Sequence, residues 1–305
     1  FDRDPSNGFR CAKALTHGSF PEELDRPLER IQATDWRQVE PFSNEEFQTR
    51  MEFFEYANRP LDPMLELTDD SALNWRLEKV SFDNDVRVVI VTGAGEGFCA
   101  GADLEDPGWL DIFNGLTVPG IARRAMKILD DVIKTIHDMH QPVIGAINGP
   151  AIGGGFCLAM ATDIRVAASE AYFRPAGINN GLTSAELGLS YLLPRAIGTS
   201  RAFEIMLTGR DVSAQEAANL GLVSKAVERG ELLDECYRIA ERICGFSQLG
   251  VELSKQMLWA GVDAGSLHTH MNHEGHAQLF VRMTTQNFEE AIKARKEGRA
   301  PDYKD

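Results

Sequence analysis

The chain has few cysteines, fewer basic than acidic residues and no long apolar run, and each shortage argues against a class of protein. Its 305 residues include five cysteines, an odd number without zinc-site spacing, so we expect free thiols rather than disulfides. Lysine and arginine number 31 against 46 acidic residues, which argues against binding to nucleic-acid phosphates. No apolar run approaches the ~20 residues of a membrane span, and no signal peptide is expected. These shortages predict a cytoplasmic protein with no metal, nucleic-acid or membrane partner.

Two apolar runs within residues 86–164 each lead into a glycine-rich turn. Val88–Thr92 precedes Gly93-Ala-Gly-Glu-Gly-Phe-Cys-Ala-Gly-Ala-Asp103, and Val143–Ile147 precedes Gly149-Pro-Ala-Ile-Gly-Gly-Gly155. Both runs lack charge and favour β-structure, which is typical of central parallel strands covered on both faces. Glycine allows a ligand to approach peptide N–H groups closely, so the two turns together predict a pair of donors for a developing oxyanion.

These turns also carry a family resemblance. Phe98-Cys-Ala-Gly-Ala-Asp-Leu104 and Asn148-Gly-Pro-Ala-Ile-Gly-Gly-Gly155 resemble the two signature segments of the crotonase (enoyl-CoA hydratase/isomerase) superfamily. Further matching segments follow in the family's order, and the resemblance covers roughly residues 58 to 300: Asp163-Ile-Arg-Val-Ala167, Leu207-Thr-Gly-Arg210, Ala214-Gln-Glu-Ala-Ala-Asn-Leu-Gly-Leu-Val223 and Phe288-Glu-Glu-Ala-Ile-Lys-Ala-Arg295. It implies a crotonase-like α/β fold, a spiral of ββα units with a C-terminal helical trimerisation region.

We accordingly divide the chain into a poorly patterned N-terminal extension (1–44), a crotonase-like α/β core (45–225) and a C-terminal helical region (226–305). Within these limits the apolar spacing predicts a strand over 163–167, two short helices within 199–222, and helical segments over 68–80, 121–139, 155–161, 232–244, 251–261 and 267–295. Four histidines stand in the last segment, and only two of them have clear same-face spacing: His268, His270, His273 and His276. We expect them to lie on a solvated or interface face rather than to bind a metal.

The resemblance assigns roles to individual residues. In the family the thioester carbonyl of an acyl-CoA lies between two peptide N–H groups, and the matching positions here are Ala102 and Gly154. The alternative is that both turns merely pack a helix against the sheet. The positions expected to line the substrate site are Ala100, Asp103, Leu104, Gly153, Cys157 and Gly177.

The acid and base positions depart from the hydratase pattern. Hydratases of this family usually carry one glutamate where Cys157 stands and a second where Gly177 stands. A thiol replaces a carboxylate poorly unless its surroundings lower its pKa, and a buried cysteine is more often a small apolar filler. Glu186 lies in the segment that resembles the one from which dienoyl-CoA isomerase and several hydratase-like relatives also direct an acidic residue into the acyl pocket. Apolar neighbours favour a raised pKa and an acid/base role for it; the alternative is a structural glutamate that is paired with Arg195 or caps a neighbouring turn.

The predicted function is an enoyl-CoA hydratase/isomerase of fatty-acid or related metabolism that stabilises a thioester enolate. Its expected partner is an acyl-CoA thioester, with no cofactor beyond the CoA of the substrate, and the expected assembly is a homotrimer or hexamer. A single acid favours double-bond migration, whereas the overall pattern resembles hydratases. Two alternatives stay open: another crotonase reaction, such as thioester hydrolysis or decarboxylation, and a non-catalytic acyl-CoA-binding relative.

Overall fold

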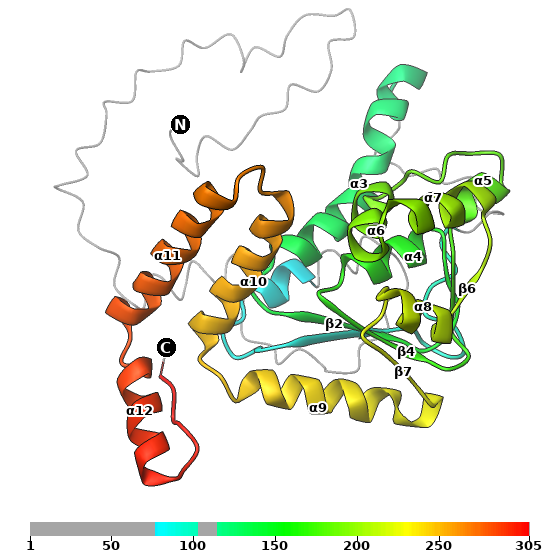
Figure 1. Cartoon of the computed structure of the whole chain (residues 1–305). Coiled ribbons are helices and arrows are strands. Elements are labelled where there is room, and N and C mark those ends of the chain that lie inside the picture. The colour runs from blue at the N-terminus through cyan, green and yellow to red at the C-terminus, as the bar shows by residue number, and fades with distance from the viewer. Residues whose placement is uncertain (1–76, 103–114, 305) are drawn as a thin grey trace, which may run out of the picture. The chain divides into compact units, whose positions relative to one another are not determined.

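The computed structural model describes residues 77–102 and 115–304 (Figure 1). The chain divides into two compact units, Phe1–Arg59 and Pro60–Asp305, and all described residues belong to the second. The predicted extension 1–44 and most of the predicted helix 68–80 lie outside the described residues. The end of that helix is described, and residues 77–81 are helical. The proposed domain boundaries therefore stay predictions.

The main sheet is parallel, as the two uncharged apolar runs predict. Its four described strands stand in the order β1-β2-β4-β7 and comprise β1 (Val89–Thr92), β2 (Val143–Ile147), β4 (Ile164–Ala168) and β7 (Lys225–Val227). The register pairs Val89 with Val143 and Ile144 with Ile164. β2 is central and buried at every residue. β1 stands at the end of the described strand order and is only half-buried, so within this part of the chain the prediction of two central strands holds for β2 alone.

Helices cover both faces of this sheet, which explains why β2 is apolar without alternation. Ile144 and Ala146 point to one face and pack with Leu232 and Cys236 of α9 (Leu232–Cys244). Ile147 points to the opposite face, into a larger core with residues of α4 (Gly154–Ala161) and α6 (Leu189–Ile197). Figure 1 shows α9 below the sheet and α4, α6 and α7 (Thr199–Thr208) above it.

A second, smaller sheet brings the two glycine turns together. It comprises β3 (Ala151–Ile152), β5 (Tyr172–Arg174) and β6 (Val212–Ser213); β3 runs parallel to β5, and β5 runs antiparallel to β6. An isolated parallel bridge joins Cys99 to Ala151. The first glycine turn is thereby attached to the strand that enters the second.

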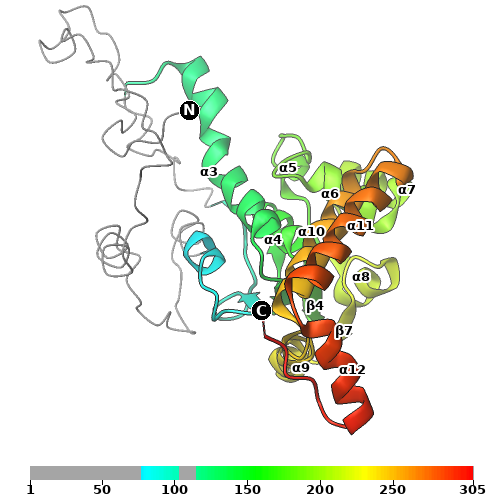
Figure 2. The ribbon, with the colours of Figure 1, turned by 90° about the vertical axis from the view of Figure 1, so that its left-hand side faces the viewer.

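The remaining helices agree with the apolar spacing at most positions. The described helices not yet given are α3 (Val118–Asp138), α5 (Ala176–Asn179), α8 (Ala214–Leu220), α10 (Gln248–Asp263), α11 (Leu267–Thr284) and α12 (Asn287–Glu297), with a 3₁₀ turn at Arg229–Glu231. The predicted helical region 267–295 is thus two helices, because Thr285 leaves helical geometry with an extended backbone. Figure 2 shows α10 and α11 lying side by side.

A buried ion pair attaches α10 to the main sheet. The Lys255 ammonium, 6% exposed, lies 2.9 Å from Asp163 Oδ2 and donates to the carbonyls of Ile136 and Gln141 at 2.8 and 3.0 Å. Asp163 also accepts from the Val143 amide and from the Trp259 indole N–H. Burial lowers the pKa of Lys255 while the Asp163 charge opposes the change. Every ammonium proton has an acceptor, which allows a charge to be buried here.

No helix in the described part of the chain is both long and apolar enough to cross a membrane.

Candidate active site

The two glycine turns lie against each other at one edge of the main sheet. The Ile152 amide donates to the Cys99 carbonyl at 2.9 Å, and the Phe98 and Cys99 amides donate to the Pro150 carbonyl at 3.0 and 3.1 Å. A Cβ on Gly154 would lie 3.8 Å from the Gly101 Cα. The backbone at Gly101–Ala102 therefore faces the first turn of α4, as the pairing of the two motifs predicts.

Two glycines of the second turn are required by its shape. Gly153 precedes α4 with φ +55° and ψ −117°, which a residue with a Cβ rarely adopts. Gly155 allows the close approach itself, because a Cβ there would lie 2.1 Å from the Cys99 carbonyl oxygen. The triple glycine therefore orients the start of α4 toward the first turn.

The arrangement leaves peptide N–H groups available at the turns. Gly154 is the first residue of α4, so its amide has no acceptor one turn earlier within the helix. Within residues 77–102 and 115–304, neither this amide nor that of Ala102 donates to a protein acceptor. Ala100 and Ala102 are exposed, whereas Asp103 and Leu104 lie outside the described residues. Two amides without an acceptor in the described part of the chain suit an anionic oxygen, with the positive end of the α4 dipole behind one of them.

Asn148 ties the two turns together, and the sequence analysis gave it no role. Its Oδ1 accepts from the Gly93 amide at 3.0 Å, and its Nδ2 donates to the carbonyls of Gly95 and Gly97, each at 3.2 Å. Asn148 is only 9% exposed. A polar residue directly after an entirely apolar strand was the signal in the sequence that could have identified it.

Glu186 lies beside the second turn. Its Oε1 is 4.0 Å from the position a Cβ on Gly153 would occupy, and the side chain is half-buried. Desolvation raises the pKa of this carboxyl, and among the described residues it forms no ion pair. Arg195 is instead stacked over the Tyr191 ring on its own helix, 3.4 Å from the ring centroid. Glu186 thus has the position and the perturbation of an acid/base group.

The two positions where hydratases usually carry glutamate hold no acid here. Cys157 is fully buried in α4, and burial, together with the Glu186 charge, raises the pKa of its thiol. The start of α4 does not activate this thiol, which argues against an acid/base role for Cys157. Gly177 is buried in α5, where a Cβ would lie 2.1 Å from the Thr183 carbonyl oxygen. The packing here leaves no space for a side chain at position 177.

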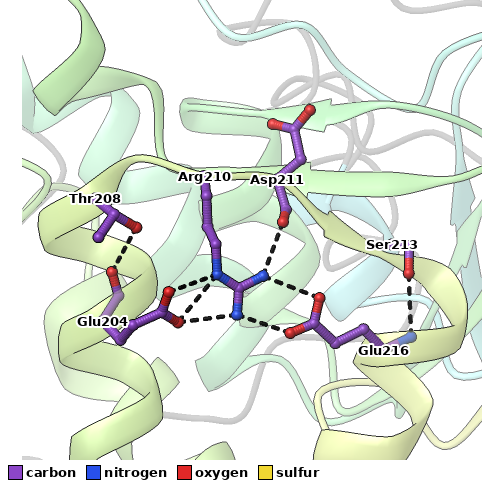
Figure 3. A network of polar contacts seen from close by, with 6 residues as sticks. All are labelled: Glu204, Thr208, Arg210, Asp211, Ser213 and Glu216. Atoms are coloured by element: carbon purple, nitrogen blue, oxygen red, sulfur yellow. Dashed lines mark hydrogen bonds and ion pairs between the residues drawn. The ribbon is translucent and has the colours of Figure 1, made fainter.

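An ion-pair network centred on Arg210 joins α7 to α8 (Figure 3). The Arg210 guanidinium bonds both carboxylate oxygens of Glu204 on α7 and both of Glu216 on α8. These charge-assisted bonds raise the pKa of Arg210 further above its usual range and fix the end of α7 relative to α8. Next to it, the Asn179 side chain of α5 donates to the Gly209 carbonyl at 2.9 Å.

The histidine-rich helix does not form a metal-binding cluster in the described part of the chain. Over residues 77–102 and 115–304, no three histidine, cysteine, aspartate or glutamate side chains are grouped to hold an ion. His268, His273 and His276 are exposed on α11. His270 lies 3.4 Å from Glu274 one turn away.

Comparisons with known proteins agree with this geometry. The model of the enoyl-CoA hydratase/isomerase family matches residues 65–305. The chain is 63% identical to the probable enoyl-CoA hydratase EchA12 of Mycobacterium tuberculosis over 233 residues, 76% of this chain and 82% of that protein. It is similar to the crystal structure of a probable enoyl-CoA hydratase/isomerase from Mycobacterium abscessus (59% identity, TM-score 0.73, covering 77% of this chain and 87% of that one). It is also similar to that of a monofunctional enoyl-CoA isomerase from M. smegmatis (51% identity, TM-score 0.56, covering 70% and 90%).

Proposed function

The chain belongs to the enoyl-CoA hydratase/isomerase family, whose substrates are acyl-CoA thioesters, and within it we propose that this member is an isomerase that moves a double bond from C3 to C2 of the acyl chain. One observation carries the proposal. Among residues 77–102 and 115–304, Glu186 is the carboxylate beside the paired amide turns, while Cys157 and Gly177 provide no second acid. Hydration of the kind the family performs usually employs two carboxylates, whereas migration needs one group that removes a proton and returns it.

The proposed reaction begins with the thioester carbonyl of a 3-enoyl-CoA accepting hydrogen bonds from the amides of Ala102 and Gly154. Polarisation of this carbonyl makes the C2 protons acidic, and the ionised Glu186 removes one. The negative charge then resides mainly on the thioester oxygen, between the two N–H groups. Glu186, now protonated, delivers the proton to C4, and the double bond forms between C2 and C3. The carboxylate is regenerated, and no water is consumed.

The raised pKa of Glu186 suits both halves of this cycle. A carboxylate with the ordinary pKa is a weak base toward carbon, and desolvation strengthens it. The same shift brings the pKa of the protonated carboxyl closer to neutral pH, so one group can both remove and return the proton. The name of the M. smegmatis relative supports isomerisation, while that of the M. tuberculosis relative supports hydration.

The decisive experiment follows the mass and absorbance of the product with two substrates. We expect 3-hexenoyl-CoA to gain the absorbance of a conjugated enoyl thioester without a change in mass, and Glu186→Gln to slow this by ~10²-fold or more. Glu241→Gln, on the exposed surface of α9, is the matched control and should leave the rate unchanged. Crotonyl-CoA that gains the mass of one water as fast as 3-hexenoyl-CoA isomerises would contradict the proposal. Released CoA thiol or carbon dioxide would indicate a different reaction of the family.

We also propose that the chain assembles as a homotrimer through its C-terminal helices. Exposed apolar side chains gather on them: Leu258, Leu267, Met271, Leu279, Phe280 and Met283. A groove of about 1210 Å³ lies between α10, α11 and α12. Several exposed apolar side chains on the same helices, Met283 at 82% exposure among them, are more typical of a protein–protein contact than single exposed residues are. Native mass spectrometry should give three chains, and Met283→Glu should reduce this to one. Tyr237→Glu on α9 is the control, and a parent protein that is monomeric would overturn the proposal.

The absence of a cofactor beyond the CoA of the substrate forms part of this proposal. The cytoplasmic location expected from the cysteine content stays a prediction.

A further inference from the structure

The backbone immediately after Glu186 has an unusual conformation. Leu187 has φ +45° and is the only residue other than glycine with a positive φ among those the structure describes. Gly188 follows with φ +79° and ψ 0°. A left-handed conformation is unfavourable for a leucine because its Cβ comes too close to the following carbonyl oxygen, so the surrounding structure must hold it in place.

One restraint comes from α4. The Cys157 thiol donates to the Glu186 carbonyl oxygen across 3.6 Å, and the same oxygen accepts from the Leu189 amide at 2.8 Å. Because burial raises the pKa of Cys157, the thiol retains its proton at neutral pH and remains a donor. Cys157, which stands where hydratases usually carry a glutamate, therefore contacts the backbone of Glu186.

A second restraint comes from α7. The Ser184 hydroxyl, in a residue 7% exposed, donates to the Met206 carbonyl at 2.6 Å. Met206 lies in the last turn of α7, next to the segment held by the Arg210 network (Figure 3). The backbone around Glu186 is thus held at two points, by the Cys157 side chain of α4 and by the bond from Ser184 to the backbone of α7.

These restraints determine what the turn presents to the site. Leu187 Cδ1 lies 3.7 Å from the position of a Cβ on Gly154, so the leucine side chain covers the first residue of α4. The Glu186 carboxylate reaches toward Gly153, one residue earlier. A right-handed Leu187 would redirect the chain at this point and move both side chains away from the glycine turn.

We propose that Cys157 and Ser184 are positioning residues that hold the left-handed turn at Leu187 and thereby direct the Glu186 carboxylate at the substrate C2 and C4 carbons. This inference rests on the proposed isomerase function, and it assigns Cys157 a role as hydrogen-bond donor rather than as acid or base. Neither residue contacts the reacting atoms, so each acts through Glu186.

The test uses Cys157→Ala and Ser184→Ala, which each remove one restraint. With 3-hexenoyl-CoA we expect kcat to fall about tenfold in each, since misplacement of a catalytic group by a fraction of an ångström costs this order of rate. KM should stay within about twofold because the amide turns are untouched. Cys157→Ser keeps a donor and should recover most of the lost kcat. Ser224→Ala is the control, because the exposed Ser224 Oγ also donates to a backbone carbonyl, that of Arg165 in β4, at 2.7 Å.

A pH profile separates positioning from a general loss of stability. Among the described titratable groups, Cys157 of α4 interacts with the Glu186 carboxylate, Arg195 of α6 is stacked on Tyr191, and Arg210 is held by its two glutamates. Burial therefore sets the pKa of Glu186. Releasing the turn exposes the carboxylate, so the acid limb of kcat/KM should move to lower pH in both alanine variants and stay in place in Ser224→Ala.

Amide hydrogen exchange of the peptide 184–189 decides the matter independently of turnover. Faster exchange in Cys157→Ala and Ser184→Ala than in Ser224→Ala supports the two restraints whether or not the protein turns over 3-hexenoyl-CoA. If exchange is faster but 3-hexenoyl-CoA is not a substrate, only the proposed function fails. If Glu186→Gln abolishes turnover while both alanine variants match Ser224→Ala in kcat, pH profile and exchange, the positioning role is wrong and the proposed function stands.

Discussion

Replacing Asn148 with alanine should both weaken the fold and slow turnover, because this side chain connects the two turns that carry the candidate oxyanion donors. It accepts hydrogen bonds from the Gly93 amide and, at 3.4 Å, from the Thr92 hydroxyl, and it donates to the carbonyls of Gly95 and Gly97. The alanine variant loses all four bonds at a nearly buried position.

The size of the effect follows from those contacts. A net hydrogen bond contributes about 0.5–1.5 kcal/mol, and the long bonds here belong at the lower end. The Gly95 carbonyl is exposed and also accepts from Arg229 at 2.9 Å, so its loss costs little. We therefore expect the free energy of unfolding to fall by about 2–3 kcal/mol, which lowers Tm by about 5–10 °C in a domain of this size. We also expect kcat to fall about tenfold, since a misplaced donor keeps part of its effect.

Differential scanning fluorimetry and steady-state kinetics with 3-hexenoyl-CoA measure both effects. The control is Asn219→Ala, which removes an exposed side chain whose amide oxygen accepts one bond from Gln215 and should change the stability by less than about 0.5 kcal/mol. An Asn148→Ala variant that melts within about 2 °C of the parent and keeps its kcat would refute the idea that this side chain holds the turns together.

Three further predictions concern stability. Lys255→Met should lower the free energy of unfolding, measured by urea denaturation, by about 3 kcal/mol, because it leaves the Asp163 carboxylate with only its two uncharged donors. Lys134→Met, which breaks an exposed ion pair, is the control and should have almost no effect. Arg210→Lys should cost about 1 kcal/mol in low salt and less at 1 M NaCl, since lysine cannot bond two carboxylates in bidentate fashion; an equal loss at both salt concentrations would contradict this. The pKa of Glu186 in the folded state is raised above its ordinary value of 4.5. The stability contributed by its protonated carboxyl is therefore fully present below pH 4.5 and is lost as the pH rises through the folded-state pKa. Glu186→Gln should therefore be more stable than the parent at neutral pH and show little gain near pH 4 by thermal melts, and a gain independent of pH would count against the shift.

Much of the fold could be predicted from the sequence, because local pattern and burial agree in most elements. The run Val143–Ile147 is apolar at every position, and it is the strand covered on both faces. The predicted helix 232–244 matches α9 at both ends. The break between α11 and α12 was missed, since nothing in the apolar spacing marks Thr285 as a helix end.

The small sheet also escaped prediction. β3 and β6 contain two residues each, and elements this short carry no periodic signal. Their pairing depends on segments far apart in the chain, such as Phe173 with Val212. This sheet nevertheless places the triple glycine beside Cys99 and so determines where the second amide lies.

The sequence by itself determined the family, the two glycine turns and the identity of Glu186 as the candidate carboxylate, because glycine patterns and residue types are local properties. Only the tertiary structure decided what surrounds them. It showed that a carbonyl fills the space where a side chain at Gly177 would stand, that the Cys157 thiol faces the Glu186 backbone, and that Leu187 adopts a left-handed conformation. The Cys157 contact joins α4 to a turn that follows it about thirty residues later, and the spacing of residues along one segment cannot specify a contact between two segments.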